Sequence, residues 1–116
     1  TLNAPYPCTR SGFLKMTYLV MAKEGADFNA FFDYWLGDHV SNVMDVMNQV
    51  GGFRYVVSHS IDPASEPYAG MAELYFRDAA GLTAFGNTIQ PDGMQEWSDA
   101  AGTVALASTT EMIGLP

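Results

Sequence analysis

Apolar residues recur at steps of three and four positions in the segment that follows Asp27, with one histidine among them. The series consists of Phe28, Phe31, Phe32, Trp35, Leu36, His39, Val40, Val43, Met47 and Val50. This spacing is typical of an amphipathic helix. Asp27 is a suitable N-cap, and Gly51 followed by Gly52 is a natural C-terminal stop. We expect Gly37 to kink or split the helix, because glycine costs about 1 kcal/mol relative to alanine in a helix interior.

Other segments have the composition of strands, with β-branched and aromatic residues between turn residues. The predicted strands cover residues 15–22, 53–60, 71–76 and 109–113. A second helical region is predicted to begin after Asp78 and to reach about residue 87. Beyond an interruption at Pro91, it is predicted to continue over residues 94–106.

The order of these elements defines the expected fold class. The chain reads β-α-β-β-α-β, which is the ferredoxin-like arrangement. We therefore predict an α+β fold with a four-stranded antiparallel sheet and the helices on one face. Pro5, Pro7 and Gly12 indicate an extended N-terminal arm over residues 1–14, which leaves residues 15–116 as a single domain.

The sheet face that the helices leave open is expected to be apolar as well. In both central strands the two alternating sets of side chains are largely apolar, as Tyr55 beside Val56 and Leu74 beside Tyr75 illustrate. Exposing such a face would be unfavourable, at about 25 cal/mol per Å² of apolar area. We therefore predict a homodimer in which two sheets stack about a two-fold axis and form a shared α+β barrel.

The composition narrows the range of partners. A formal net charge of −8 repels phosphate backbones, so no nucleic acid partner is expected. The apolar runs are too short to span a bilayer, and no basic leader followed by an apolar segment is visible, so no membrane partner is predicted. The single cysteine, Cys8, cannot form an internal disulfide, which fits a reducing compartment. We expect a cytoplasmic protein.

Three segments carry a family resemblance. The first, on the predicted helix, is Tyr34-Trp35-Leu36-Gly37-Asp38-His39, a match to the pattern Y-W-x-x-x-H. The second is Gly52-Phe53-Arg54-Tyr55, with His59 following on the same strand. The third is Gly70-Met71-Ala72-Glu73-Leu74-Tyr75-Phe76, with Asp78 just after it. In order and spacing, the chain from about residue 15 to residue 112 resembles the EthD family of the dimeric α+β barrel superfamily.

The resemblance implies a domain without a cofactor and with a cavity between helices and sheet. Members and near relatives include isomerases, cyclases, decarboxylases, dehydratases and oxygenases that act on aromatic, polyketide or lactone compounds. The chain departs from the usual pattern in its long N-terminal arm and in residues 44–51, where the family more often has a short segment with a proline. Both departures leave the substrate's identity open.

His39 is the first candidate for chemistry. It shares a helix face with Trp35 and Leu36, and that face should point toward the sheet. An inward histidine is either an acid–base or substrate-binding group, or a core residue whose nitrogens bond to a carbonyl or a tyrosine. Tyr55 and His59 are four residues apart on one strand and share a sheet face. Tyr55 could donate to a substrate carbonyl and stabilise an enolate, whereas His59 is either functional or exposed at the strand end.

Glu73 is the fourth catalytic candidate. In an apolar setting its pKa would be raised and it could act as a base, or it could instead pair with Arg54 or Lys15. The aromatic residues that are candidates for the cavity wall, or for ordinary core packing, are Phe32, Trp35, Tyr75, Phe85 and Trp97. The spacing of His39, His59 and Glu73 gives no support to a metal site, so no metal is predicted.

These observations favour a small, cofactor-independent enzyme. We expect acid–base chemistry, such as cyclisation, dehydration, decarboxylation or isomerisation, on a small apolar aromatic, polyketide or lactone substrate. His39 would move the proton and Tyr55 would polarise the substrate oxygen. Three alternatives remain open: a cofactor-free oxygenase of the same fold, a non-catalytic protein that binds a small molecule, and a purely structural dimer module.

Overall fold

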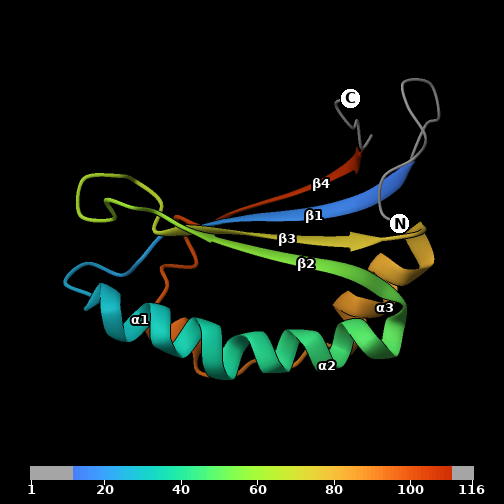
Figure 1. Ribbon diagram of the computed structural model, residues 1–116, viewed down its shortest axis with the longest axis horizontal. Coiled ribbons are helices and arrows are strands. Elements are labelled where there is room, and N and C mark those ends of the chain that lie inside the picture. The colour runs from blue at the N-terminus through green and yellow to red at the C-terminus, as the bar shows by residue number, and fades with distance from the viewer. Residues whose placement is uncertain (1–11, 111–116) are drawn as a thin grey trace, which may run out of the picture.

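A four-stranded antiparallel sheet lies over a layer of helices in the computed structural model, which describes residues 12–110 (Figure 1). The strands are β1 (Phe13–Val20), β2 (Gly52–His59), β3 (Gly70–Phe76) and β4 (Val104–Thr110). Their order across the sheet is β2-β3-β1-β4, and each neighbouring pair is antiparallel. This is the predicted ferredoxin-like fold. Residues 1–11 of the expected arm lie outside the described residues.

One long helical segment crosses the sheet and contains an irregular turn in its middle. It consists of α1 (Phe28–Tyr34), the π-helical turn η1 (Trp35–His39) and α2 (Val40–Val50). The side chain of Asp27 caps α1 by accepting from the Ala30 N–H at 3.2 Å, and Gly51 ends α2 with a positive φ of 79°. The irregularity expected at Gly37 is therefore a π turn, a feature that is frequent at functional sites.

The second helical region differs from the prediction. Helix α3 (Ala79–Thr88) is capped by Asp78 as expected, but the predicted helix over 94–106 is wrong. Only the short 3₁₀ turn η2 (Met94–Glu96) forms there, and β4 already begins at Val104, ahead of the predicted strand at 109–113. The Asp99 carboxylate accepts backbone N–H groups from Ala101 and Gly102, and this local turn competes with helix formation. Residues 111–113 lie outside the described part of the chain.

The core lies between the sheet and the helices. Along β3, the residues facing the helices are buried, and they alternate with less buried residues on the other face. Phe31 and Trp35 have no exposed surface, and Phe31 stacks on Trp35 with 5.5 Å between ring centroids. The edge of the Trp35 ring lies against Gly70 of β3, where a side chain would collide with it. The close approach of helix and sheet at this point therefore requires glycine.

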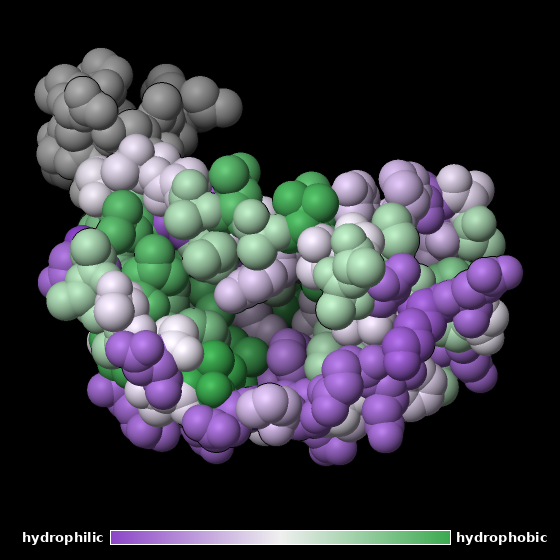
Figure 2. Space-filling view, turned by 180° about the vertical axis from the view of Figure 1, so that it is seen from behind, coloured by the Kyte–Doolittle hydropathy of each residue, from purple (hydrophilic) through white to green (hydrophobic). Residues whose placement is uncertain are grey.

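The opposite face of the sheet carries both charged and exposed apolar side chains. Lys15 of β1 and Glu73 of β3 form an ion pair there, with 2.9 Å between Nζ and Oε2. On the same face, Val104 and Leu106 of the edge strand β4 are 42% and 60% exposed. Hydrophobic residues also gather along the upper margin of the molecule, where the sheet lies (Figure 2). These exposed apolar side chains agree with a partner on this face.

Substitution of Gly70 tests the contact that fixes Trp35. A Cβ at position 70 would lie 2.8 Å from the Trp35 ring and 2.8 Å from the Ser58 carbonyl oxygen. We expect Gly70→Ala to lower the free energy of unfolding by about 1–3 kcal/mol in urea titrations, because overpacking forces the core to shift. The matched control is Gly86→Ala on α3, where a Cβ meets nothing within 4 Å. It should stabilise the protein by about 0.5–1 kcal/mol. Equal effects of the two changes would contradict this packing.

Candidate functional site

An apolar cavity of about 220 Å³ lies between the helices and the sheet. Its lining residues come from both layers and from the segment between α3 and β4: Tyr18, Val20, Trp35, His39, Val43, Tyr55, Ala72, Leu74, Phe85, Ile89, Met94, Ser98 and Thr103. Seen from behind, the molecule is hollowed between its sheet side and its helix side, with hydrophobic residues on the left of the hollow and more polar residues at its lower right (Figure 2). A cavity of this kind suits a small apolar ligand.

His39 lies at the rim of this cavity and is paired with a carboxylate. It ends the π-helical turn, and its Nδ1 is 2.8 Å from Oδ2 of Asp92, a residue of the loop between α3 and η2. The two side chains are 23% and 17% exposed. His39 also lines an open depression on the outer surface, so the imidazole lies between the cavity and solvent. With Nδ1 bonded to Asp92, Nε2 is the nitrogen left to meet a ligand.

Asp92 is the centre of a hydrogen-bond network. Its carboxylate also accepts from the Asn42 amide at 2.9 Å, the Met94 N–H at 2.8 Å and the Tyr34 hydroxyl at 3.2 Å. Burial by itself would raise the pKa of Asp92, but the hydrogen bonds from Asn42, His39 and Met94 outweigh it and lower that pKa. Asp92 is therefore an ionised acceptor that holds the imidazole in one orientation.

Tyr55 extends from β2 into the space between sheet and helices. Its hydroxyl oxygen is buried and has no hydrogen-bond partner among residues 12–110. Burial raises the pKa of this phenol to about 12. The Trp35 indole N–H lies near enough to counter that shift in part, although the two groups do not have the geometry of a regular hydrogen bond. Tyr55 is thus a neutral phenol at the pH of the cell.

His59 does not line the cavity. Its ring stacks on Phe32, with 3.9 Å between centroids, and contacts Trp35 at 4.8 Å. Burial lowers the pKa of His59, so the imidazole is neutral at pH 7. Its Nε2 has no partner in the described part of the chain.

Glu73 lies on the opposite face of the sheet, where it pairs with Lys15. The sequence left this pairing open as the structural alternative to catalysis. The hydrogen bond to Glu73 raises the pKa of Lys15, and Tyr75 lies on the same face as the pair. Glu73 and Tyr75 therefore do not meet the cavity within this protomer.

The aromatic residues proposed for the cavity wall divide into two groups. Trp35 and Phe85 line the cavity, whereas Phe32 and Trp97 pack against the core beside it. The sequence did not identify Asp92 as the partner of His39, nor Asn42 and Tyr34 as further donors to Asp92. The only signal for Asp92 was the polar loop around Pro91, and nothing in its spacing indicated which helix it would contact.

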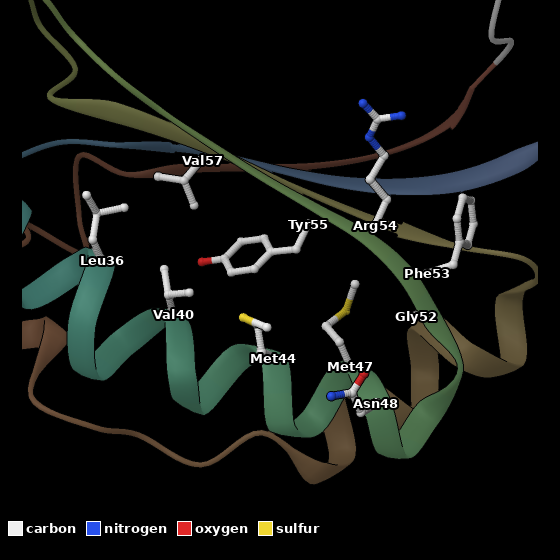
Figure 3. A pocket seen from close by; sticks show the side chains of 10 residues that line it. All are labelled: Leu36, Val40, Met44, Met47, Asn48, Gly52, Phe53, Arg54, Tyr55 and Val57. Atoms are coloured by element: carbon white, nitrogen blue, oxygen red, sulfur yellow. The ribbon is translucent and has the colours of Figure 1, made fainter. Parts of the chain in front are cut away.

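A second, more open groove of about 390 Å³ runs between α2 and β2 (Figure 3). Apolar side chains from α2 point up toward the strand, and the Tyr55 ring extends sideways between the two elements, while Arg54 turns its guanidinium away. The apolar lining consists of Leu36, Val40, Met44, Met47, Phe53, Tyr55 and Val57. Tyr55 is common to the groove and the cavity and therefore lies at their junction.

Within residues 12–110, no three His, Cys, Asp or Glu side chains come together in a way that could hold a metal ion. His39, His59 and Glu73 do not converge. Among the described helices, none has the length and apolar character needed to cross a membrane.

Solved structures of similar shape show the fold class of this protein. A dimeric protein of ferredoxin-like fold from Bacteroides fragilis superposes with a TM-score of 0.50 at 11% identity, covering 88% of this chain and 100% of the other. A Nitrosomonas europaea protein, described as a candidate antibiotic biosynthesis monooxygenase, superposes with a TM-score of 0.59 at 13% identity over 90% and 95% of the two chains. At these identities the likeness shows the α+β ferredoxin-like fold.

The family follows from the sequence itself. The EthD domain matches residues 23–101, so the chain belongs to the EthD family, as the three segments predicted. An EthD-like protein from Ralstonia eutropha superposes with a TM-score of 0.57 at 18% identity over 87% of this chain and 92% of the other. No curated protein matches the sequence.

The network around Asp92 predicts a pH-dependent contribution to stability. Because its pKa in the folded protein lies below the unfolded value of 3.8, the contribution is complete above that value and is lost as pH falls through the folded pKa. We expect Asp92→Asn to cost about 1–3 kcal/mol from pH 7 down to about pH 4, and progressively less as the pH falls below 3.8. Urea unfolding of both proteins from pH 7 to pH 3 measures this difference.

The control is Asp45→Asn, because Asp45 is exposed on α2. It should have little effect at any pH. A cost of Asp92→Asn that is independent of pH would contradict the ionised network.

Proposed function

We propose that this EthD-family protein is a cofactor-independent enzyme that carries out acid–base chemistry on a small apolar molecule. The observation that carries the proposal is the His39–Asp92 pair at the rim of an apolar cavity, with 2.8 Å between Nδ1 and Oδ2. A positioned imidazole with a carboxylate behind it is the arrangement that general acid–base catalysis requires.

His39 and Asp92 have different roles in the proposed proton transfer. In the neutral imidazole, Nδ1–H donates to the Asp92 carboxylate and Nε2 is left with a free lone pair. Nε2 takes a proton from substrate in the cavity, and the charge of Asp92 stabilises the imidazolium that forms. The imidazolium then returns this proton to a different atom of the intermediate, and the product forms. Asp92 acts through His39 and is therefore a positioning residue.

The cavity supports an aromatic, polyketide or lactone substrate. Its walls are largely apolar, and the neutral Tyr55 phenol can donate a hydrogen bond to a substrate carbonyl as negative charge develops on it. Cyclisation, dehydration, decarboxylation and isomerisation next to a carbonyl can each proceed through such an enolate, whose charge Tyr55 would stabilise. We further propose that the enzyme acts as a homodimer, on the basis of the exposed Val104 and Leu106 and the dimeric structural neighbour.

A cofactor-free oxygenase is the second candidate. The Nitrosomonas europaea neighbour described as a candidate antibiotic biosynthesis monooxygenase favours it. A base that forms a substrate carbanion also serves that reaction, so His39 would have the same first task. Oxygen uptake during turnover distinguishes the two functions, because the acid–base reactions consume none.

Substitution of His39 tests the proposal. A thermal-shift screen of aromatic ketones, polyketide-like phenols and lactones supplies the substrate. We expect His39→Ala to slow turnover by about 10²–10⁴-fold while the fold and oligomeric state persist, because one positioned acid–base group contributes about that much. Stopped-assay rates for wild type and variant, together with light scattering, measure the effect.

The matched control is His59→Ala, which removes the other imidazole, outside the cavity. It should change the rate far less than His39→Ala does. Full activity of a folded His39→Ala protein would refute the assignment. Loss of the fold would instead assign His39 a purely structural role.

A further inference from the structure

Two buried polar atoms of the cavity wall are left without partners. The indole nitrogen of Trp35 and the hydroxyl oxygen of Tyr55 are inaccessible to solvent, and neither has a hydrogen-bond partner among residues 12–110. Both residues line the cavity, and Trp35 has no exposed surface at all. Folded proteins leave few buried donors unpaired, because each loses its bonds to water without replacement.

The two donor groups lie close together on the wall of the cavity. The Trp35 N–H is close enough to the Tyr55 hydroxyl to affect its ionisation. Even if the indole donated to the phenol oxygen, the phenol proton would still need an acceptor. An indole nitrogen is only a donor, so rearrangement of these two side chains cannot satisfy both. Among residues 12–110, no group accepts a hydrogen bond from either donor.

The position of the Trp35 donor is fixed by packing. The ring stacks on Phe31 with an interplanar angle of 25°, and its outer edge lies against Gly70. It belongs to the π-helical turn that also carries His39. A donor held in this way is preorganised, because no side-chain freedom is lost when a ligand binds.

We propose that Trp35 and Tyr55 form a two-donor site that binds one acceptor oxygen, a carbonyl or an enolate oxygen, of an apolar ligand. Trp35 is then a specificity-determining residue and more than a wall of the cavity. Tyr55 also borders the groove between α2 and β2 (Figure 3). The bound oxygen therefore lies where the cavity meets that groove.

The site selects by hydrogen-bond polarity. It accepts an apolar ketone, lactone or enolate and disfavours a hydrocarbon of the same shape, which would leave both donors unpaired. The inference deepens the proposed function, because it rests on the same cavity and names the group by which the substrate is held.

A pair of probes of almost equal shape tests the site. 1-Tetralone carries one acceptor oxygen on an apolar bicyclic body, and tetralin is the same body without it. Isothermal titration gives the dissociation constant of each, and their ratio is the oxygen preference. We expect wild type to prefer 1-tetralone by about tenfold or more. Trp35→Phe and Tyr55→Phe should each lower that preference by about three- to tenfold, the usual effect of one neutral hydrogen bond.

Matched substitutions elsewhere serve as controls. Trp97→Phe alters a tryptophan that packs against Phe31 outside the cavity, and Tyr68→Phe removes a hydroxyl in the loop between β2 and β3. Both should keep the oxygen preference of wild type. His39→Ala should keep it too, so a protein in which the preference persists while turnover is lost separates this inference from the proposed function.

The following results would overturn the inference. The first is a wild-type protein that binds 1-tetralone no more tightly than tetralin, or that binds neither. The second is a Tyr55→Phe protein that keeps the full oxygen preference; this variant is sufficient by itself if Trp35→Phe does not fold. Equal losses in the Trp97→Phe or Tyr68→Phe controls would overturn it as well.

Discussion

The ionised carboxylate of Asp92 is the interaction on which the site depends. It accepts hydrogen bonds from His39, Asn42 and Tyr34 on the long helical segment and from the Met94 N–H at the start of η2. A single charged acceptor thereby ties the loop after α3 to the middle of that helix. Asn42 adds a bond to the Gln90 carbonyl at 3.0 Å, and the Gly93 N–H donates to the Tyr34 hydroxyl. The loop that closes one side of the cavity and the imidazole at its rim are therefore held by the same group.

One face of the sheet forms the other half of the site, and side chains on the opposite face do not reach it. Residues of β2 and β3 that point toward the helices, such as Tyr55 and Leu74, form the cavity floor. Glu73 points the other way and pairs with Lys15, so a carboxylate that looks catalytic in the sequence has a structural partner. The π-helical turn completes the arrangement, because it presents both Trp35 and His39 to the cavity. The candidate catalytic residues therefore lie where the π-helical turn faces the sheet.

Much of the fold could be predicted because its signals are local. The apolar spacing from Phe28 to Val50, the caps at Asp27 and Asp78 and the glycine stop at Gly51 specify the helices directly. Residues 94–106 have a helical composition, but the turn at Asp99 interrupts them, and pairing with β1 makes residues 104–106 part of β4.

The site was less predictable, because its partners lie far apart in the chain. His39 and Tyr55 follow from facial periodicity, whereas Asp92 is 53 residues from His39 in a loop without periodicity. Glu73 could not be assigned to a face, since both faces of β3 are largely apolar in the sequence. His59 shares the face of Tyr55, as strand alternation requires, but the ring of Phe32 covers it.

The most direct test of the account is the tautomer of His39. If Asp92 orients the ring, the neutral imidazole carries its proton on Nδ1 and leaves Nε2 free toward the ligand. Long-range ¹H–¹⁵N correlation spectra, recorded at a pH where the ring is neutral and assigned with a His39→Gln variant, distinguish the two nitrogens. The account predicts a protonated Nδ1 and an unprotonated Nε2 in wild type. A proton on Nε2 would contradict it, because Nδ1 could then donate nothing to Asp92 and the imidazole would have no free base directed at substrate.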